Sequence, residues 1–152
     1  MRHDIHHLAA CFLLAVATRV HAGPQEEVAE IDAPRLELME RGDAGSYATA
    51  FAENGVLHSE LLPFRVEGRS AIRAQFAQFF LIYPKRKMFI RQPTVRVYGE
   101  ELLVQNAYAD LYLTDTSGKV LVVPSRSSTV WSRANGKWQI VEQHVSRLQG
   151  AQ

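Results

Sequence analysis

The chain of 152 residues carries 17 basic and 16 acidic side chains, which give it a formal net charge of +1 at neutral pH. Hydrophobic residues make up 47% and charged residues 22% of the sequence, and this composition excludes the disordered and fibrous classes. The length suits one globular domain. The balanced charge also argues against a nucleic-acid partner, which requires a basic surface.

The N-terminal residues have the pattern of a secretory signal. A polar start leads into an apolar run over residues 8–17, and a short polar stretch then ends in Val20-His21-Ala22, a pattern that signal peptidase cleaves. We therefore expect a signal peptide over residues 1–22, a folded domain over 23–148 and a tail over 149–152. The mature protein is expected to be secreted or periplasmic, without a membrane span, because the apolar run is shorter than the ~20 residues that cross a bilayer.

Cys11 is the only cysteine of the chain. The run Leu8-Ala9-Ala10-Cys11 matches the box that precedes a lipid-bearing cysteine in bacterial lipoproteins, but here the apolar run continues beyond Cys11, whereas such a box ends it. Soluble export is the favoured expectation, and a lipoprotein is the alternative. Cleavage would leave His58 and His144 as the only histidines, without the spacing of a metal site, so we expect no metal and no cofactor.

The first half of the folded domain has helical periodicity. A helix is predicted over residues 26–41, with a kink or restart at Pro34, because proline removes a backbone donor and clashes with the preceding turn. Further helices are predicted over 44–51 and 70–83. Between the last two helices, the pattern indicates a turn at 53–55, a short strand at 56–60 and its return at 64–66.

The second half has the alternation of β-strands. Turn-forming residues separate the runs and predict a four-stranded antiparallel meander. Such long strands must twist and bend. Because helices come first and strands follow, we expect an α+β fold: a cone-shaped, strongly curved antiparallel sheet wrapped around a long N-terminal helix, with two further helices. The predicted strands cover residues 88–98, 102–114, 120–133 and 137–148.

Four short motifs carry a resemblance to a known family. They are Arg41-Gly42-Asp43, Phe51-Ala52-Glu53-Asn54-Gly55-Val56, Val66-Glu67-Gly68 and Val130-Trp131-Ser132-Arg133-Ala134-Asn135-Gly136-Lys137-Trp138-Gln139-Ile140-Val141. In this element order they resemble the nuclear transport factor 2-like (NTF2-like) superfamily, SnoaL-like branch. The last motif is most similar to the association domain of calcium/calmodulin-dependent protein kinase type II. The resemblance implies the fold and homodimerisation through the sheet, but leaves function open, because this fold hosts isomerases, dehydratases, cyclases and oligomerisation modules.

Strand alternation predicts where a ligand pocket lies. On the run 102–114, one face is apolar and includes the small residues Ala107 and Ala109, while the other face carries tyrosines and Asp110. We assign the small-residue face to a concave cavity and the tyrosine face to a partner subunit or solvent. The expected pocket residues are His58, Ser59, Gln105, Ala107, Ala109, Ser127, Thr129 and Trp131.

The resemblance also implies a tyrosine and two arginines that face the pocket of the kinase association domain. Here those positions are Ala107, Ala109 and Thr129. Without these cations, a neutral or apolar ligand is expected rather than a carboxylate or an acidic peptide.

Three residues are candidates for acid or base chemistry. The resemblance to steroid isomerases implies a carboxylate base on the first strand, and the matching position is Ser59, with Glu60 beside it. Alternation places His144 on the same face as Trp138, near the cavity mouth, as a base or as a structural residue. Tyr47 could donate a hydrogen bond into the cavity or simply pack against the sheet.

The sequence therefore leaves three functions open. The leading hypothesis is an exported homodimer whose cavity binds a small, largely apolar molecule without covalent chemistry. The second is a cofactor-free isomerase, dehydratase or cyclase that uses Glu60 or His144 with Tyr47. The third is a protein-association scaffold whose cavity is filled by its own phenylalanines.

Overall fold

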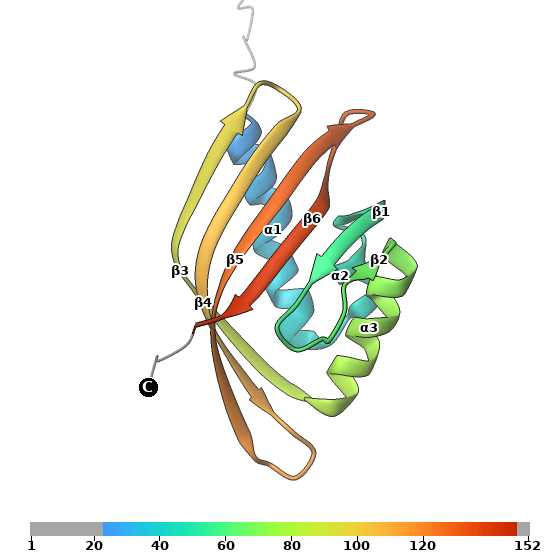
Figure 1. Cartoon of the computed structure of the whole chain (residues 1–152), viewed down its shortest axis with the longest axis vertical. Helices are drawn as coiled ribbons and strands as arrows, with labels where there is room; N and C mark the ends of the chain where they lie inside the picture. Colours follow the sequence, from blue (N-terminus) through green and yellow to red (C-terminus); the bar gives the residue numbers. More distant parts are fainter. Residues whose placement is uncertain (1–22, 149–152) are drawn as a thin grey trace, which may run out of the picture.

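The computed structural model describes residues 23–148, and the predicted signal and tail lie outside this range (Figure 1). Six strands form one curved sheet in the order β2-β1-β6-β5-β4-β3, and α1 runs along one face of it (Figure 1). The predicted α+β class, with a curved sheet around a long helix, is confirmed. The elements are α1 (Pro24–Arg41), α2 (Ala44–Ala48), β1 (Phe51–His58), β2 (Val66–Glu67), α3 (Arg69–Ile82), β3 (Lys85–Tyr98), β4 (Leu102–Thr114), β5 (Val120–Ala134) and β6 (Lys137–Arg147).

The predicted meander is present as β3 to β6. These strands pair in antiparallel fashion, and the β4–β5 register runs without interruption from Leu102 opposite Ser132 to Thr114 opposite Val120. The sheet is not wholly antiparallel, however, because β1 pairs with β6 in parallel. No helix within residues 23–148 is long and apolar enough to span a membrane.

The region around β1 differs from the prediction. The second helix ends at Ala48 rather than at residue 51, and the expected turn at 53–55 lies inside β1. The register against β6 shifts between Phe51 and Val56, so the Asn-Gly pair forms a bulge in the strand instead of a turn between elements. Gly55 is required there, because a Cβ atom would lie 2.9 Å from the carbonyl oxygen of Ile140.

The expected interruption of the first helix is also absent. α1 continues through Pro34 as one helix of 18 residues. Pro34 lies on the exposed side, where water can hydrogen-bond the carbonyl that the proline leaves without a donor. The helix ends at Gly42, whose left-handed φ of 78° allows the backbone N–H groups of Gly42 and Asp43 to close the last turn.

The core lies between the concave face of the sheet and the helices. Its largest side chains without solvent exposure include Trp131, Phe51, Ile72 and Ile140, which come from β5, β1, α3 and β6. The core therefore forms only when the second half of the chain packs onto the first.

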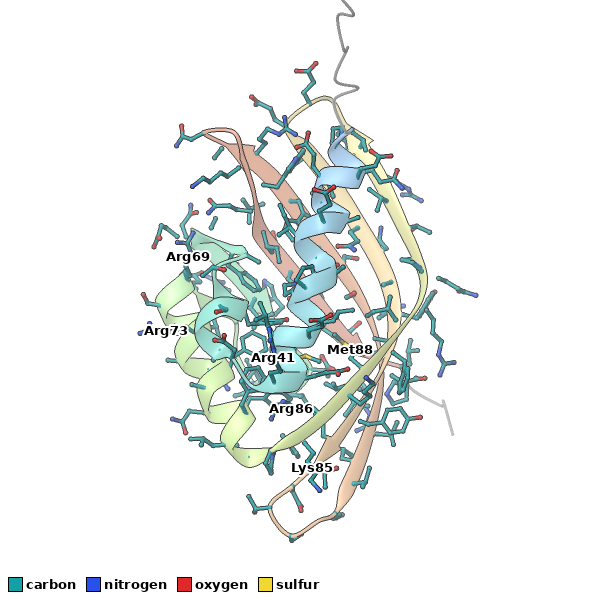
Figure 2. The ribbon with its side chains drawn as sticks, turned by 180° about the vertical axis from the view of Figure 1, so that it is seen from behind. Arg41, Arg69, Arg73, Lys85, Arg86 and Met88 are labelled. Atoms are coloured by element: carbon teal, nitrogen blue, oxygen red, sulfur yellow. The ribbon has the colours of Figure 1, made fainter. Side chains whose placement is uncertain are left out.

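Arg86, at the start of β3, joins the C-terminal ends of two helices. Its guanidinium donates hydrogen bonds to the carbonyl oxygens of Met39 (2.8 Å) and Glu40 (3.0 Å) in α1, and to those of Phe80 (3.3 Å) and Tyr83 at the end of α3. Figure 2 shows Arg86 between these two helix ends. Burial lowers the pKa of Arg86, and the side chain donates to carbonyls at two helix ends, where carbonyls lack donors from their own helix; the Met39 carbonyl also accepts from the N–H of Gly42.

We expect Arg86→Met to lower the free energy of unfolding by about 3 kcal/mol, because it leaves buried helix carbonyls without donors while keeping a long apolar side chain. Urea unfolding followed by circular dichroism measures the change. Lys85→Met is the matched control, since Lys85 is the exposed neighbour on the same strand. Equal stability of the two variants would contradict a capping role for Arg86.

Candidate functional site

A cavity of ≈130 Å³ lies between the concave face of the sheet and the helices. Strands β3 to β6 and the end of β1 form its wall, while α1, α2, α3 and the segment after β1 cover it. Phe76 and Phe79 line this cavity without filling it. Under the scaffold hypothesis the protein's own phenylalanines would fill this cavity, but the cavity is open.

Several of the predicted pocket residues line this cavity. Ala107 and Ala109 are both 8% exposed and form part of the β4 wall. On β5 the facing positions carry small polar side chains. The other predicted residues that line the cavity are Ser59, Gln105, Ser127 and Thr129.

The remaining two predicted pocket residues lie elsewhere. Trp131 is fully buried in the core behind Gln105, to which its indole N–H donates a hydrogen bond of 3.0 Å. His58 ends β1 and does not line the cavity; its ring centroid lies 5.5 Å from that of His144.

The placement of His144 near the cavity mouth is wrong. A register shift between β5 and β6 pairs Val130 with Glu142 but Trp131 with Ile140, so Val141 is an extra residue in β6. This bulge reverses the alternation of side chains along the strand. Gln143 therefore faces the cavity, and His144 is exposed on the outer face.

A buried polar network crosses the cavity. Arg35, which is 6% exposed, donates through Nε to Asp32 Oδ1 (2.7 Å) and through Nη1 to the hydroxyl of Tyr47 (2.7 Å). The other carboxylate oxygen, Asp32 Oδ2, accepts a hydrogen bond of 2.8 Å from Gln105 Nε2. The network links α1 and α2 to the β4 wall and continues through Gln105 to Trp131.

The network leaves polar hydrogens available to a ligand. Burial alone would lower the pKa of Arg35, but Tyr47 and Asp32 together raise it, so the guanidinium stays charged. Burial raises the pKa of Tyr47, so the phenol stays protonated. The Tyr47 oxygen accepts from Arg35, and neither the Tyr47 O–H nor Arg35 Nη2 donates to another residue in the described part of the chain.

The burial of Asp32 and Arg35 was not predicted, although the sequence pattern of the helix indicates it. The buried face of α1 consists of Val28, Asp32, Arg35 and Met39, spaced by four, three and four residues. Opposite charges at positions i and i+3, flanked by apolar residues at helical spacing, are the pattern of an ion pair turned inward. Ile31, an apolar residue of the same helix, is 37% exposed.

Glu60 contributes a carboxylate to the cavity. It lies just beyond β1, and its Oε2 is buried without a hydrogen-bond partner among residues 23–148. Burial raises the pKa of Glu60 above its ordinary value of 4.5. A carboxyl group whose ionised form is disfavoured in this way is a candidate for accepting or releasing a proton. No group of three or more potential metal ligands occurs within residues 23–148.

A curved sheet folded around a helix, with a cavity beneath, defines the NTF2-like class of proteins. The chain belongs to the calcium/calmodulin dependent protein kinase II association domain family, whose model matches residues 24–149. The family predicted from the sequence motifs is thereby confirmed. Comparison with curated proteins finds no match.

Solved structures agree with this assignment. A protein assigned as a calcium/calmodulin dependent protein kinase II association domain, from Xanthomonas campestris, is 26% identical, with a TM-score of 0.75 over 97% of this chain and 100% of that chain. An NTF2-like protein from Novosphingobium aromaticivorans is 23% identical, with a TM-score of 0.69 over 84% of this chain and 83% of its own. A protein assigned as an NTF2-like dehydratase, from Streptomyces avermitilis, is 17% identical, with a TM-score of 0.72 over 83% of this chain and 97% of its own. The last two likenesses show the fold alone.

Proposed function

We propose that this protein binds a small neutral molecule in its inner cavity, with an apolar body and one oxygen atom that accepts hydrogen bonds. The supporting observation is the pair of donors, Arg35 Nη2 and the Tyr47 hydroxyl, at a cavity whose walls are otherwise largely apolar. Pockets of this kind gain affinity from apolar contact and orientation from a few polar groups.

The charges around the cavity favour a neutral ligand over an anion. Arg35 is already paired with Asp32, so the two together carry no net charge. Glu60 adds a carboxyl group rather than a cation. A ligand carboxylate would therefore enter a buried site without a free counter-charge, which is costly.

The small side chains of the wall provide the space for the apolar body. Ala107 and Ala109 on β4 lie opposite Ser127 and Ser125 on β5, and all four line the cavity. A larger residue at any of these positions would occupy the volume that the ligand needs.

Binding of naphthalene and of two of its derivatives, one neutral and one charged, tests this proposal. We expect 2-naphthol to bind more tightly than naphthalene, which lacks the oxygen, and more tightly than 2-naphthoate, which is charged. Ala109→Leu should weaken 2-naphthol binding by at least about tenfold, because it fills the cavity. Fluorescence titration measures the affinities.

Val122→Leu serves as the control, because Val122 is 38% exposed and does not line the cavity. It should bind 2-naphthol like the unaltered protein. Tighter binding of 2-naphthoate than of 2-naphthol, or normal binding in Ala109→Leu, would refute the proposal.

A cofactor-free isomerase, dehydratase or cyclase is the second candidate. It is favoured by Glu60, whose buried oxygen lacks a hydrogen-bond partner in the described chain and whose pKa is raised by burial. In such an enzyme the Glu60 carboxylate would take a proton from the carbon beside a carbonyl, while Tyr47 and Arg35 would hold the carbonyl oxygen. His144 lies outside the cavity and takes no part in this proposal.

Deuterium exchange into 2-tetralone, a neutral bicyclic ketone, tests the second candidate. We expect the protein to accelerate exchange at the carbon beside the carbonyl, and Glu60→Gln to slow it by about 10²-fold or more. The rate should rise with pH and level off above the raised pKa of Glu60, because only the ionised carboxylate can act as a base. NMR in deuterated buffer measures the exchange, and absence of acceleration by the unaltered protein would eliminate this candidate.

We also propose export and homodimerisation. The family is named for association, and the outer face of the sheet has exposed apolar side chains: Phe89 is 51%, Tyr112 40% and Val122 38% exposed. The expected species is a dimer of chains that begin at Gly23. Native mass spectrometry of protein from the culture medium or periplasm measures both properties, and an uncleaved or monomeric species would contradict the corresponding part.

A further inference from the structure

The inner cavity has a second polar feature besides the donors of Arg35 and Tyr47, namely the carboxyl group of Glu60. Its Oε2 atom is buried and has no hydrogen-bond partner among residues 23–148. We propose that the cavity ligand carries a hydroxyl group that donates a hydrogen bond to this oxygen, in addition to the acceptor oxygen that Arg35 and Tyr47 hold. The inference rests on the ligand site proposed above and specifies which molecules that site takes.

The Glu60 side chain projects from a tight turn just beyond β1. The carbonyl oxygen of Ser59 accepts a hydrogen bond of 3.0 Å from the N–H of Leu62, and the Ser59 hydroxyl oxygen accepts one of 3.3 Å from the N–H of Leu61. All residues of this turn line the cavity. The carboxyl group is therefore held at the cavity before a ligand arrives, which limits the conformational entropy lost on binding.

The protein does not complete the hydrogen bonding of this carboxyl group. Burial raises the pKa of Glu60, and hydrogen bonds from its own N–H and from Ser59 offset this effect only in part and leave Oε2 without a donor. Arg147 and His144 also lower the pKa, but both are exposed, and within residues 23–148 neither forms a hydrogen bond or ion pair with Glu60. A buried acceptor without a donor costs free energy, which a donor on the ligand would recover.

Glu60 and the two donors lie on different parts of the cavity wall. The donors are tied to β4, because Asp32, which pairs with Arg35, accepts a hydrogen bond from Gln105. Glu60 instead follows β1, which is separated from β4 by β6 and β5 (Figure 1). Three strand spacings amount to roughly 14 Å along the sheet, and its curvature shortens the direct path across the cavity.

The space between these groups is open to a ligand. Within the described chain, no hydrogen bond or ion pair joins Glu60 to Arg35 or Tyr47, and Arg35 is not among the charges that act on the pKa of Glu60. A molecule that reaches both must therefore carry its two oxygens at opposite ends of an apolar body.

The chemistry of Glu60 favours a hydroxyl over other polar groups. A ligand carbonyl or ether has no hydrogen to donate, so it suits only the protonated carboxyl group. An ammonium group suits only the ionised form, which burial disfavours, and it would lose its own hydration in a largely apolar cavity. A hydroxyl can donate to both forms.

Three bicyclic ketones test the proposal by calorimetric titration of the protein: 2-tetralone, 6-hydroxy-2-tetralone and 6-methoxy-2-tetralone. In all three, the ketone oxygen is the acceptor for Arg35 and Tyr47, and the substituent lies at the opposite end. We expect the hydroxy compound to bind about tenfold more tightly than 2-tetralone, because it alone supplies a donor to Glu60. The methoxy compound has the oxygen but no hydrogen on it, and should gain nothing over 2-tetralone.

Glu60→Leu removes the acceptor and keeps a side chain of similar size. This variant should bind 6-hydroxy-2-tetralone no more tightly than 2-tetralone. Glu100→Leu is the matched control, because Glu100 is an exposed carboxylate before β4 that does not line the cavity. It should keep the tenfold preference for the hydroxy compound. Circular dichroism establishes whether both variants are folded.

The outcomes separate this inference from the ligand site on which it rests. If none of the three ketones binds, the proposed function fails and the inference fails with it. If 2-tetralone binds but the hydroxyl adds no affinity, or the methoxy group adds as much, only the inference is overturned, and these comparisons need no variant. A preference for the hydroxy compound that persists in folded Glu60→Leu, or that Glu100→Leu loses equally, also overturns it.

Discussion

The attachment of α1 to the concave face of the sheet is the constraint on which the rest of the structure depends. The buried face of this helix places Asp32 and Arg35 between Val28 and Met39, so polar contacts supplement apolar burial in holding it. Such contacts occur along its whole length. Glu27 accepts a hydrogen bond from Trp138 Nε1 (2.9 Å), Asp32 binds β4 through Gln105, and an arginine of β3 binds the last carbonyls.

This polar attachment also explains why a cavity persists under the sheet. Asp32 and Arg35 hydrogen-bond to partners instead of packing against the wall, so the small side chains of Ala107 and Ala109 leave a space opposite them. An unfilled cavity of ≈130 Å³ forgoes the packing contacts that a filled core would make. A buried ion pair adds little stability of its own. Both features are costly to the free protein, and both become useful when a ligand fills the space and Arg35 is held in place to meet it.

The sequence was most informative where one pattern repeats over many residues. Alternation along β4, with turn residues at each end, determined its bounds, its inward face and its antiparallel partners. Prediction failed where a single residue changes the pattern. Asn54-Gly55 has the composition of a turn, but pairing with β6 on one side and β2 on the other holds it inside β1. Arginine is a residue type typical of a solvated helix face, but Arg35 is buried by tertiary contacts that include Tyr47. In each case the conformation or burial of the residue depends on a distant segment of the chain, and the local sequence pattern carries no information about that segment.

One extra residue, Val141, determines the chemistry on both faces of the sheet. Without the bulge that it creates, β6 would keep its alternation, and His144 rather than Gln143 would point into the cavity. The cavity would then contain an imidazole in place of an amide. Instead, the amide of Gln143 donates a hydrogen bond of 3.1 Å to Thr129 inside, and the imidazole of His144 is exposed on the outer face. The sheet between the inner cavity and the hollow on its outer face is only one strand layer thick, since Ala107 and Ser127 border both. Side-chain size on the inner face and side-chain polarity on the outer face are therefore set by the same short segments of β4, β5 and β6.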